Sequence, residues 1–85
     1  MANKRKVEIF SADCPLCREA IVTVKQNACA SCDVIVLDMI DRNVAARAKQ
    51  LGIRAVPSVV IDGKLASMGG MDLPAWQEAG LGRPL

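Results

Sequence analysis

Four cysteines in two pairs are the residues of this chain best suited to chemistry. Each pair has a C-x-x-C spacing: Cys14 with Cys17, and Cys29 with Cys32. Thiols at this spacing form disulfides, exchange them with other molecules, or bind soft metal ions. The chain contains no histidine, so no imidazole is present as a base or a metal ligand. The function is therefore expected to depend on these four sulfur atoms.

The first pair lies where a predicted strand gives way to a predicted helix. Cys14 falls at the N-cap, beside unpaired backbone N–H groups and the positive end of the helix dipole, which favour a thiolate. Cys17 lies one turn further along the same face, where it can attack a mixed disulfide on Cys14. Arg18 favours the Cys14 thiolate and Asp13 opposes it, without a clear net sign. We predict a redox-active pair, with Cys14 as nucleophile and Cys17 as resolving thiol; inert buried thiols or half of a metal site are the alternatives.

The second pair follows this helix, and its role is open. Four thiolates together would suit a tetrahedral zinc site. The segment between Cys17 and Cys29 is mostly predicted helix, which at about 1.5 Å per residue separates the pairs by more than about 15 Å. A Zn–S bond is about 2.3 Å, so this helix excludes one shared zinc, and we expect no metal. Cys29 and Cys32 are then a structural disulfide or loosely packed thiols, an auxiliary redox pair, or part of a soft-metal site between molecules.

The predicted elements follow the order β-α-β-α-β-β-α. Strands are expected at residues 5–10, 34–37, 57–61 and 64–68, and helices at 15–28, 44–51 and 72–79. A strand–helix–strand unit makes a right-handed crossover between parallel strands, and the closing hairpin adds an antiparallel strand. We therefore expect an α/β fold, with a four-stranded mixed sheet and helices on both faces, in one domain over residues 1–85.

Local signals mark the ends of these elements. Pro15 suits the first position of a helix. Asn43 is expected to cap the second helix and Gly52 to end it. The dipeptide Asp62-Gly63 predicts a tight hairpin turn. The continuous apolar run 34–37 is typical of a strand covered on both faces.

Three segments give the chain a resemblance to the thioredoxin/glutaredoxin superfamily, and to a small member of glutaredoxin size. They are residues 6–11 with Cys14-Pro15-Leu16-Cys17, residues 55–64 with Pro57 at the start of an apolar strand, and Gly69-Gly70-Met71-Asp72. The resemblance implies a thioredoxin-like fold in which Pro57 is cis and faces the first cysteine pair. It also implies that the backbone of Val56 binds an extended substrate. An ordinary trans proline at a strand edge is the alternative.

Some positions depart from the family pattern. Two alignments are possible for Glu8. If the family pattern is aligned on Cys14, Glu8 falls where thioredoxins carry a buried acid that aids proton transfer. If it is aligned on the strand, Glu8 matches an ordinary strand residue of glutaredoxins and is expected to face solvent. Leu16 stands where many glutaredoxins have Tyr or Phe, and Asp13 where thioredoxins have Trp. The segment between Lys64 and Gly69 is longer than the usual glutaredoxin hairpin. The resemblance therefore supports a thioredoxin-like disulfide oxidoreductase better than either named class.

Composition limits the other functions. The chain has 85 residues, of which 52% are apolar and 2% aromatic, and a net charge of +2. Its one basic cluster, residues 4–6, and its lack of aromatic residues to stack on bases argue against nucleic-acid binding. No stretch approaches the roughly 20 apolar residues of a membrane span, and no export signal is visible. We expect no membrane partner and a cytoplasmic location.

Together these inferences predict a thiol–disulfide oxidoreductase of cell redox homeostasis. Its expected substrates are disulfide-containing proteins or glutathione-type molecules. No bound cofactor is expected, with reducing equivalents from glutathione or a thioredoxin-type reductase. The alternative is a thioredoxin-fold binding module for soft metal ions or a partner protein, without turnover. Both a monomer and a homodimer are compatible with the sequence.

Overall fold

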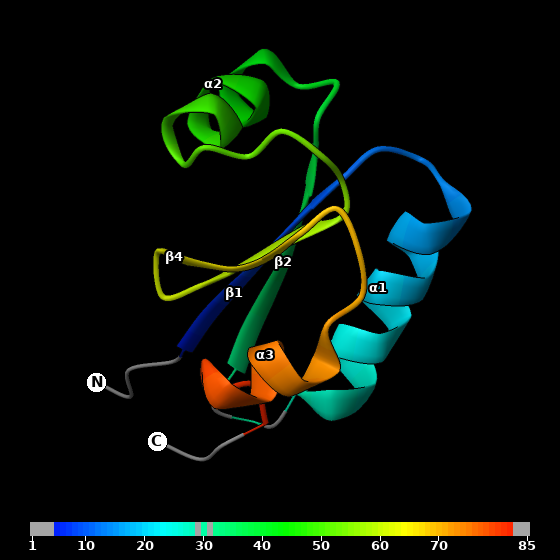
Figure 1. Ribbon diagram of the computed structural model, residues 1–85, viewed down its shortest axis with the longest axis vertical. Coiled ribbons are helices and arrows are strands. Elements are labelled where there is room, and N and C mark those ends of the chain that lie inside the picture. The colour runs from blue at the N-terminus through cyan, green and yellow to red at the C-terminus, as the bar shows by residue number, and fades with distance from the viewer. Residues whose placement is uncertain (1–4, 29, 31, 83–85) are drawn as a thin grey trace.

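The described residues form a four-stranded sheet with helices on both faces (Figure 1). The structure is a computed structural model and describes residues 5–28, 30 and 32–82. Its elements are β1 (Arg5–Ser11), α1 (Pro15–Asn27), β2 (Cys32–Asp38), α2 (Arg42–Gln50), β3 (Ser58–Ile61), β4 (Lys64–Met68) and α3 (Leu73–Glu78). The predicted order and fold class are confirmed. No helix in this part of the chain is long and apolar enough to span a membrane.

The strands lie side by side in the order β2-β1-β3-β4. β1 pairs in parallel with β2, from Arg5 opposite Cys32 to Ser11 opposite Asp38. The α1 crossover makes this parallel pairing possible, because parallel neighbours cannot be joined by a tight turn. β3 then pairs antiparallel with both β1 and β4. β1 is therefore an inner strand, and the residues after it emerge at one end of the sheet.

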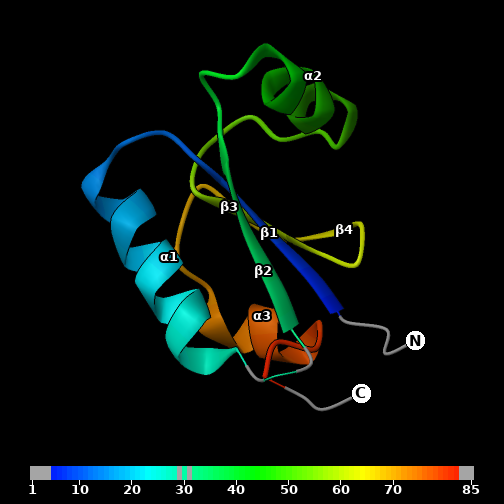
Figure 2. The same cartoon turned by 180° about the vertical axis from the view of Figure 1, so that it is seen from behind.

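The face covered by α1 and α3 holds the larger apolar cluster. Val7 and Ile9 of β1 alternate along the strand and both point to this face, as their spacing requires. Ala20 and Val24 of α1 pack against them, and each is fully buried. Trp76 of α3 completes the cluster, and its indole N–H donates to the Ser67 hydroxyl of β4 at 2.7 Å. Figure 2 shows α3 close to α1 and away from α2.

The opposite face packs against α2. Phe10 of β1 and Val60 of β3 form a second cluster there with Ala48 of α2. Half-buried Leu37 of β2 packs on this cluster, whereas its neighbour Val34 packs on the other one. Val34 and Leu37 thus contact apolar groups on opposite faces, but the predicted cover on both faces is incomplete: β2 is an edge strand without a fully buried residue, and Val36 is 42% exposed.

Two predicted boundaries are wrong. β2 begins at Cys32 and not at residue 34. Cys32 and Asp33 have no preference for strands of their own, but they pair with the backbone of β1. The N-cap of α2 is Asp41 and not Asn43: the Asp41 carboxylate accepts the Asn43 N–H at 2.8 Å. A carboxylate at this position also suits the positive end of the helix dipole.

The hairpin between β3 and β4 explains the extra length after Lys64. Asp62 and Gly63 both have positive φ, 51° and 81°, as the predicted tight turn requires. The pairing then shifts between Val59 and Val60, which leaves Ala66 as an additional residue in β4. The added length is therefore absorbed as a β-bulge within the strand.

Candidate functional site

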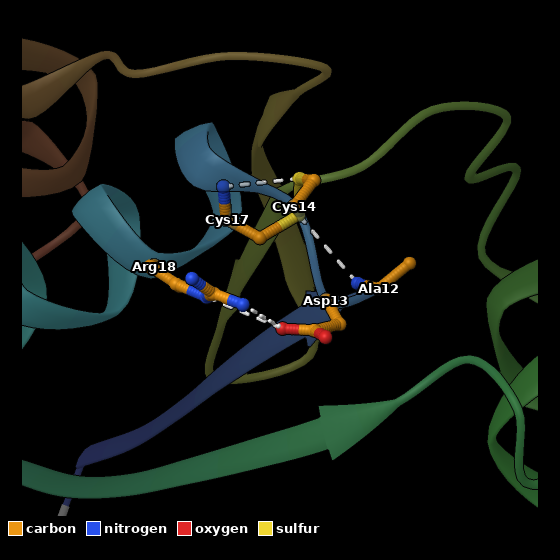
Figure 3. Close-up of polar contacts among 5 residues, drawn as sticks. All are labelled: Ala12, Asp13, Cys14, Cys17 and Arg18. Carbon is orange, nitrogen blue, oxygen red and sulfur yellow. Dashed lines mark hydrogen bonds and ion pairs between the residues drawn. A yellow bond between two sulfur atoms is a disulfide. The ribbon is translucent and has the colours of Figure 1, made fainter.

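The first cysteine pair sits in the connection between β1 and α1 (Figure 3). Cys14 is the N-cap of α1, with extended backbone angles (φ −122°, ψ 156°), and Pro15 begins the helix as predicted. Cys14 and Cys17 form a disulfide, with their Cα atoms 5.1 Å apart. This Cα separation is ordinary for a disulfide. The loop and first helical turn thus bring the two sulfurs together.

Each sulfur accepts a hydrogen bond from the backbone. The Cys17 N–H donates to Cys14 Sγ at 3.1 Å, and the Ala12 N–H donates to Cys17 Sγ at 3.5 Å (Figure 3). Cys14 is half-buried, whereas Cys17 is only 1% exposed. Backbone donors favour a thiolate over a thiol, as the positive end of a helix does. Because Cys14 is the more exposed of the two, its sulfur is the one best placed to react with another molecule.

Asp13 and Arg18 form an ion pair beside the disulfide. Arg18 Nη2 lies 2.6 Å and Arg18 Nε 3.2 Å from the same Asp13 oxygen. The hydrogen bond to Asp13, followed by its charge, raises the pKa of Arg18 above the ordinary value. Asp13 disfavours a Cys14 thiolate and Arg18 favours it. Because the two side chains are paired with each other, their opposite effects on Cys14 largely cancel. The helix N-terminus and the Cys17 N–H are then the main local support for a Cys14 thiolate.

We expect replacement of either charged partner to change the reactivity of reduced Cys14 in opposite directions. Asp13→Asn removes a neighbouring negative charge and frees Arg18, so it should favour the thiolate and speed the alkylation of reduced Cys14. Arg18→Gln should slow this alkylation. The rate of reaction with iodoacetamide at pH 7 measures both changes. Lys25→Gln, at the far end of α1, is the matched control, and equal effects of all three substitutions would contradict a local role for the pair.

Glu8 is buried within the sheet. It is 5% exposed, so the solvent-facing alternative is wrong and the burial agrees with the thioredoxin-like alignment. Arg47 of α2 pairs through Nη1 with one carboxylate oxygen of Glu8. The other oxygen, Oε1, has no hydrogen-bond partner among the described residues. Sequence reasoning missed Arg47, although a buried acid generally needs a cation nearby.

Pro57 lies at the same end of the sheet as the disulfide. The Val56–Pro57 peptide bond is cis, as the resemblance implied. Pro57 is buried and Val56 is half-buried. Phe10 pairs with Ser58, so Pro57 falls level with the end of β1 from which the Cys14 loop departs. The contact of Val56 and Pro57 with a substrate stays a prediction.

The second cysteine pair is only partly described. Cys32 is half-buried at the first position of β2, opposite Arg5 at the start of β1, whereas Cys29 lies outside the described residues. Cys32 is thus at the end of the sheet remote from Cys14 and Cys17. The helix that separates the two pairs is present as α1. The roles of Cys29 and Cys32 stay predictions.

No group of three or more Cys, Asp or Glu side chains within residues 5–28, 30 and 32–82 is arranged to hold a metal ion.

Comparisons with known proteins agree with this geometry. A family model described as a thioredoxin domain matches residues 5–78. An uncharacterised 9.0 kDa protein from the mobE 3′ region of Acidithiobacillus ferrooxidans is 60% identical over 67 residues, which are 79% of each chain. The dimeric thioredoxin-like protein NE0084 from Nitrosomonas europea has a similar structure, with a TM-score of 0.67 and 27% identity over 80% of this chain and 88% of that one. Thioredoxin F from spinach chloroplast shares the fold, with a TM-score of 0.69 and 21% identity over 92% of this chain and 74% of that one.

Proposed function

Because the chain belongs to the thioredoxin-domain family, we propose that it is a thiol–disulfide oxidoreductase that acts through Cys14 and Cys17. The observation that carries the proposal is the unequal environment of the two bonded sulfurs. Cys14 is half-buried at the N-cap of α1, whereas Cys17 is 1% exposed. A substrate that reaches Cys14 is therefore kept away from Cys17, which gives the two thiols separate roles.

In the proposed reaction, the Cys14 thiolate of the reduced protein attacks one sulfur of a substrate disulfide. A Cys14–substrate S–S bond forms, the substrate S–S bond breaks, and the first substrate thiolate leaves and takes a proton from water. Cys17 then loses its proton and attacks Cys14 Sγ. The Cys14–Cys17 disulfide forms, and the bond between Cys14 and the substrate breaks. The second substrate sulfur leaves as a thiolate and takes a proton from water. Two electrons pass from the protein to the substrate.

The surrounding residues support this sequence of steps. The Cys17 N–H, 3.1 Å from Cys14 Sγ, is placed to stabilise the attacking thiolate. We assign substrate binding to the backbone of Val56 beside Pro57, on the basis of the family resemblance. The same resemblance assigns to the buried Glu8 carboxylate a part in the proton transfer from Cys17.

The substrates we propose are disulfides of proteins or of glutathione-type molecules. Because the sulfurs themselves carry the electrons, the reaction needs no bound cofactor, and glutathione or a thioredoxin-type reductase would regenerate the dithiol. The sequence favours a cytoplasmic protein without nucleic-acid or membrane partners, acting as a monomer or a homodimer. These assignments rest on composition and resemblance.

The proposed function is tested by reduction of oxidised insulin with dithiothreitol as the electron donor. Cys14→Ser removes the attacking sulfur and should lower the catalysed rate at least about 100-fold, to the rate of dithiothreitol alone. Cys32→Ser, at the start of β2 and remote from the disulfide, should retain most of the activity. Equal rates for wild type and Cys14→Ser would exclude the proposed function. They would favour the alternative, a thioredoxin-fold module that binds soft metal ions or a partner protein without turnover.

A further inference from the structure

A mainly apolar recess lies along α1 and begins at Arg18, about one helical turn beyond Cys14. It has a volume of about 330 Å³ and is lined by Arg18, Glu19, Val22 and Thr23 of α1 and by Met71, which precedes α3. Val22 is 53% exposed and Met71 40% exposed, although both are apolar. The recess is thus a surface where two large apolar side chains meet solvent on one side of the helix that carries the cysteines.

Arg18 connects this recess with the segment that carries Cys14. Its guanidinium is held by Asp13, which directly precedes Cys14, while the same residue lines the recess (Figure 3). An arginine whose charged group is engaged in this way leaves its methylene chain to pack against apolar groups. A molecule joined to Cys14 is therefore about one helical turn from Arg18, the first residue that lines the recess.

We propose that the recess binds one apolar side chain of a protein substrate, near the substrate's reactive cysteine. The proposal rests on the proposed function, and it makes Val22 and Met71 determinants of substrate preference. The α1 residues of the recess, from Arg18 to Thr23, lie four to nine positions beyond Cys14, or about 6–13 Å along the helix at 1.5 Å per residue. An extended polypeptide covers about 3.3 Å per residue, so the apolar side chain should stand about two to four residues from the substrate cysteine.

The size of the recess favours a substrate side chain over a second copy of the protein. A stable dimer buries about 800 Å² on each partner, contributed by about 20–30 residues. The recess is formed by five residues. Contact on this scale holds a substrate during a reaction and still permits its release.

The test uses the reduced protein in single-turnover reactions with symmetrical peptide disulfides. Each peptide carries one cysteine in a Gly/Ser sequence, with a single leucine placed at successive distances from the cysteine. Hydroxyethyl disulfide serves as a substrate too small to reach the recess. Wild type should react about tenfold faster with peptides carrying leucine at two to four residues than with the leucine-free peptide, a difference of about 1.4 kcal/mol in transition-state binding.

Val22→Ser and Met71→Ser remove an exposed apolar side chain without adding a charge. Each should reduce the leucine preference about threefold or more. Neither should change the rate with hydroxyethyl disulfide. Val36→Ser is the matched control, because Val36 is 42% exposed on β2 and does not line the recess. It should keep the full preference.

Three results would overturn the inference. The first is a leucine preference that is absent in wild type or unchanged in Val22→Ser and Met71→Ser. The second is a wild-type dimer in gel filtration that Val22→Ser converts to a monomer, since a second copy would then cover the recess. The third is a lack of reaction with any disulfide, hydroxyethyl disulfide included, which would also exclude the proposed function. A normal reaction with hydroxyethyl disulfide without a leucine preference would exclude the recess alone.

Discussion

Replacement of Cys17 by serine should convert the protein into a trap that keeps its substrate attached to Cys14. Cys14 can still attack a disulfide, but no resolving thiol stands beside it to release the product. Intramolecular groups held in position reach effective concentrations of about 10⁵ M or more, so the loss of Cys17 should lengthen the life of the mixed disulfide at least about 100-fold. Serine keeps an acceptor for the Ala12 N–H in the buried position.

The trapped species is measured on non-reducing gels and by mass spectrometry of the protein after exposure to disulfide-containing proteins. Cys14→Ser/Cys17→Ser is the control, because it differs from the trap only in the attacking sulfur. Adducts should form with Cys17→Ser and not with the double variant. Adducts that persist in the double variant would mean that another cysteine is the reactive one.

Replacement of Trp76 by alanine should be the most destabilising single change in the apolar core. Trp76 is fully buried between α3 and the sheet, in an 85-residue chain with one Phe and no Tyr. Removal of a buried Trp side chain costs about 3–5 kcal/mol. Domains of this kind have a total unfolding free energy of about 5–15 kcal/mol. Urea unfolding followed by circular dichroism measures the loss without depending on the tryptophan itself.

Trp76→Phe separates packing from hydrogen bonding at this position. Phenylalanine keeps most of the apolar volume but cannot donate to the Ser67 hydroxyl, which accepts from Trp76 at 2.7 Å. Its loss of stability should be about 1–2 kcal/mol, well below that of alanine. If Trp76→Ala unfolds at the same urea concentration as wild type, the position of Trp76 in the core is wrong.

The elements around the site were predictable because local signals and burial agree there. Val7 and Ile9 alternate on a strand, Ala20 and Val24 share a helix face, and these pairs meet in one cluster. A cysteine pair placed between those two segments necessarily falls at the junction of strand and helix. The unequal exposure of the two sulfurs follows from that position.

The features that the sequence does not reveal depend on residues far apart in the chain. Glu8 and Arg47 are thirty-nine positions apart and become partners only when α2 covers its face of the sheet. Cys32 enters β2 because β1 offers it a partner, not because of its own strand preference. Asp41 precedes Asn43 by two positions, and either residue type caps helices well, so only the backbone geometry decides between them.

The two ends of the described chain, Arg5 and Gly82, lie far from Cys14, and this arrangement suits attachment of the protein to a surface. Arg5 begins β1 at the end of the strand away from Cys14 (Figure 1). A Cβ atom at Gly82 would collide with the carbonyl of Asn27, so Gly82 lies beside the last residue of α1. Both ends of the described chain therefore lie at the end of the molecule that is remote from the Cys14–Cys17 disulfide. A tether joined at either end should leave Cys14 facing the solution, so the protein can be immobilised on a resin or an electrode with its reactive sulfur outward.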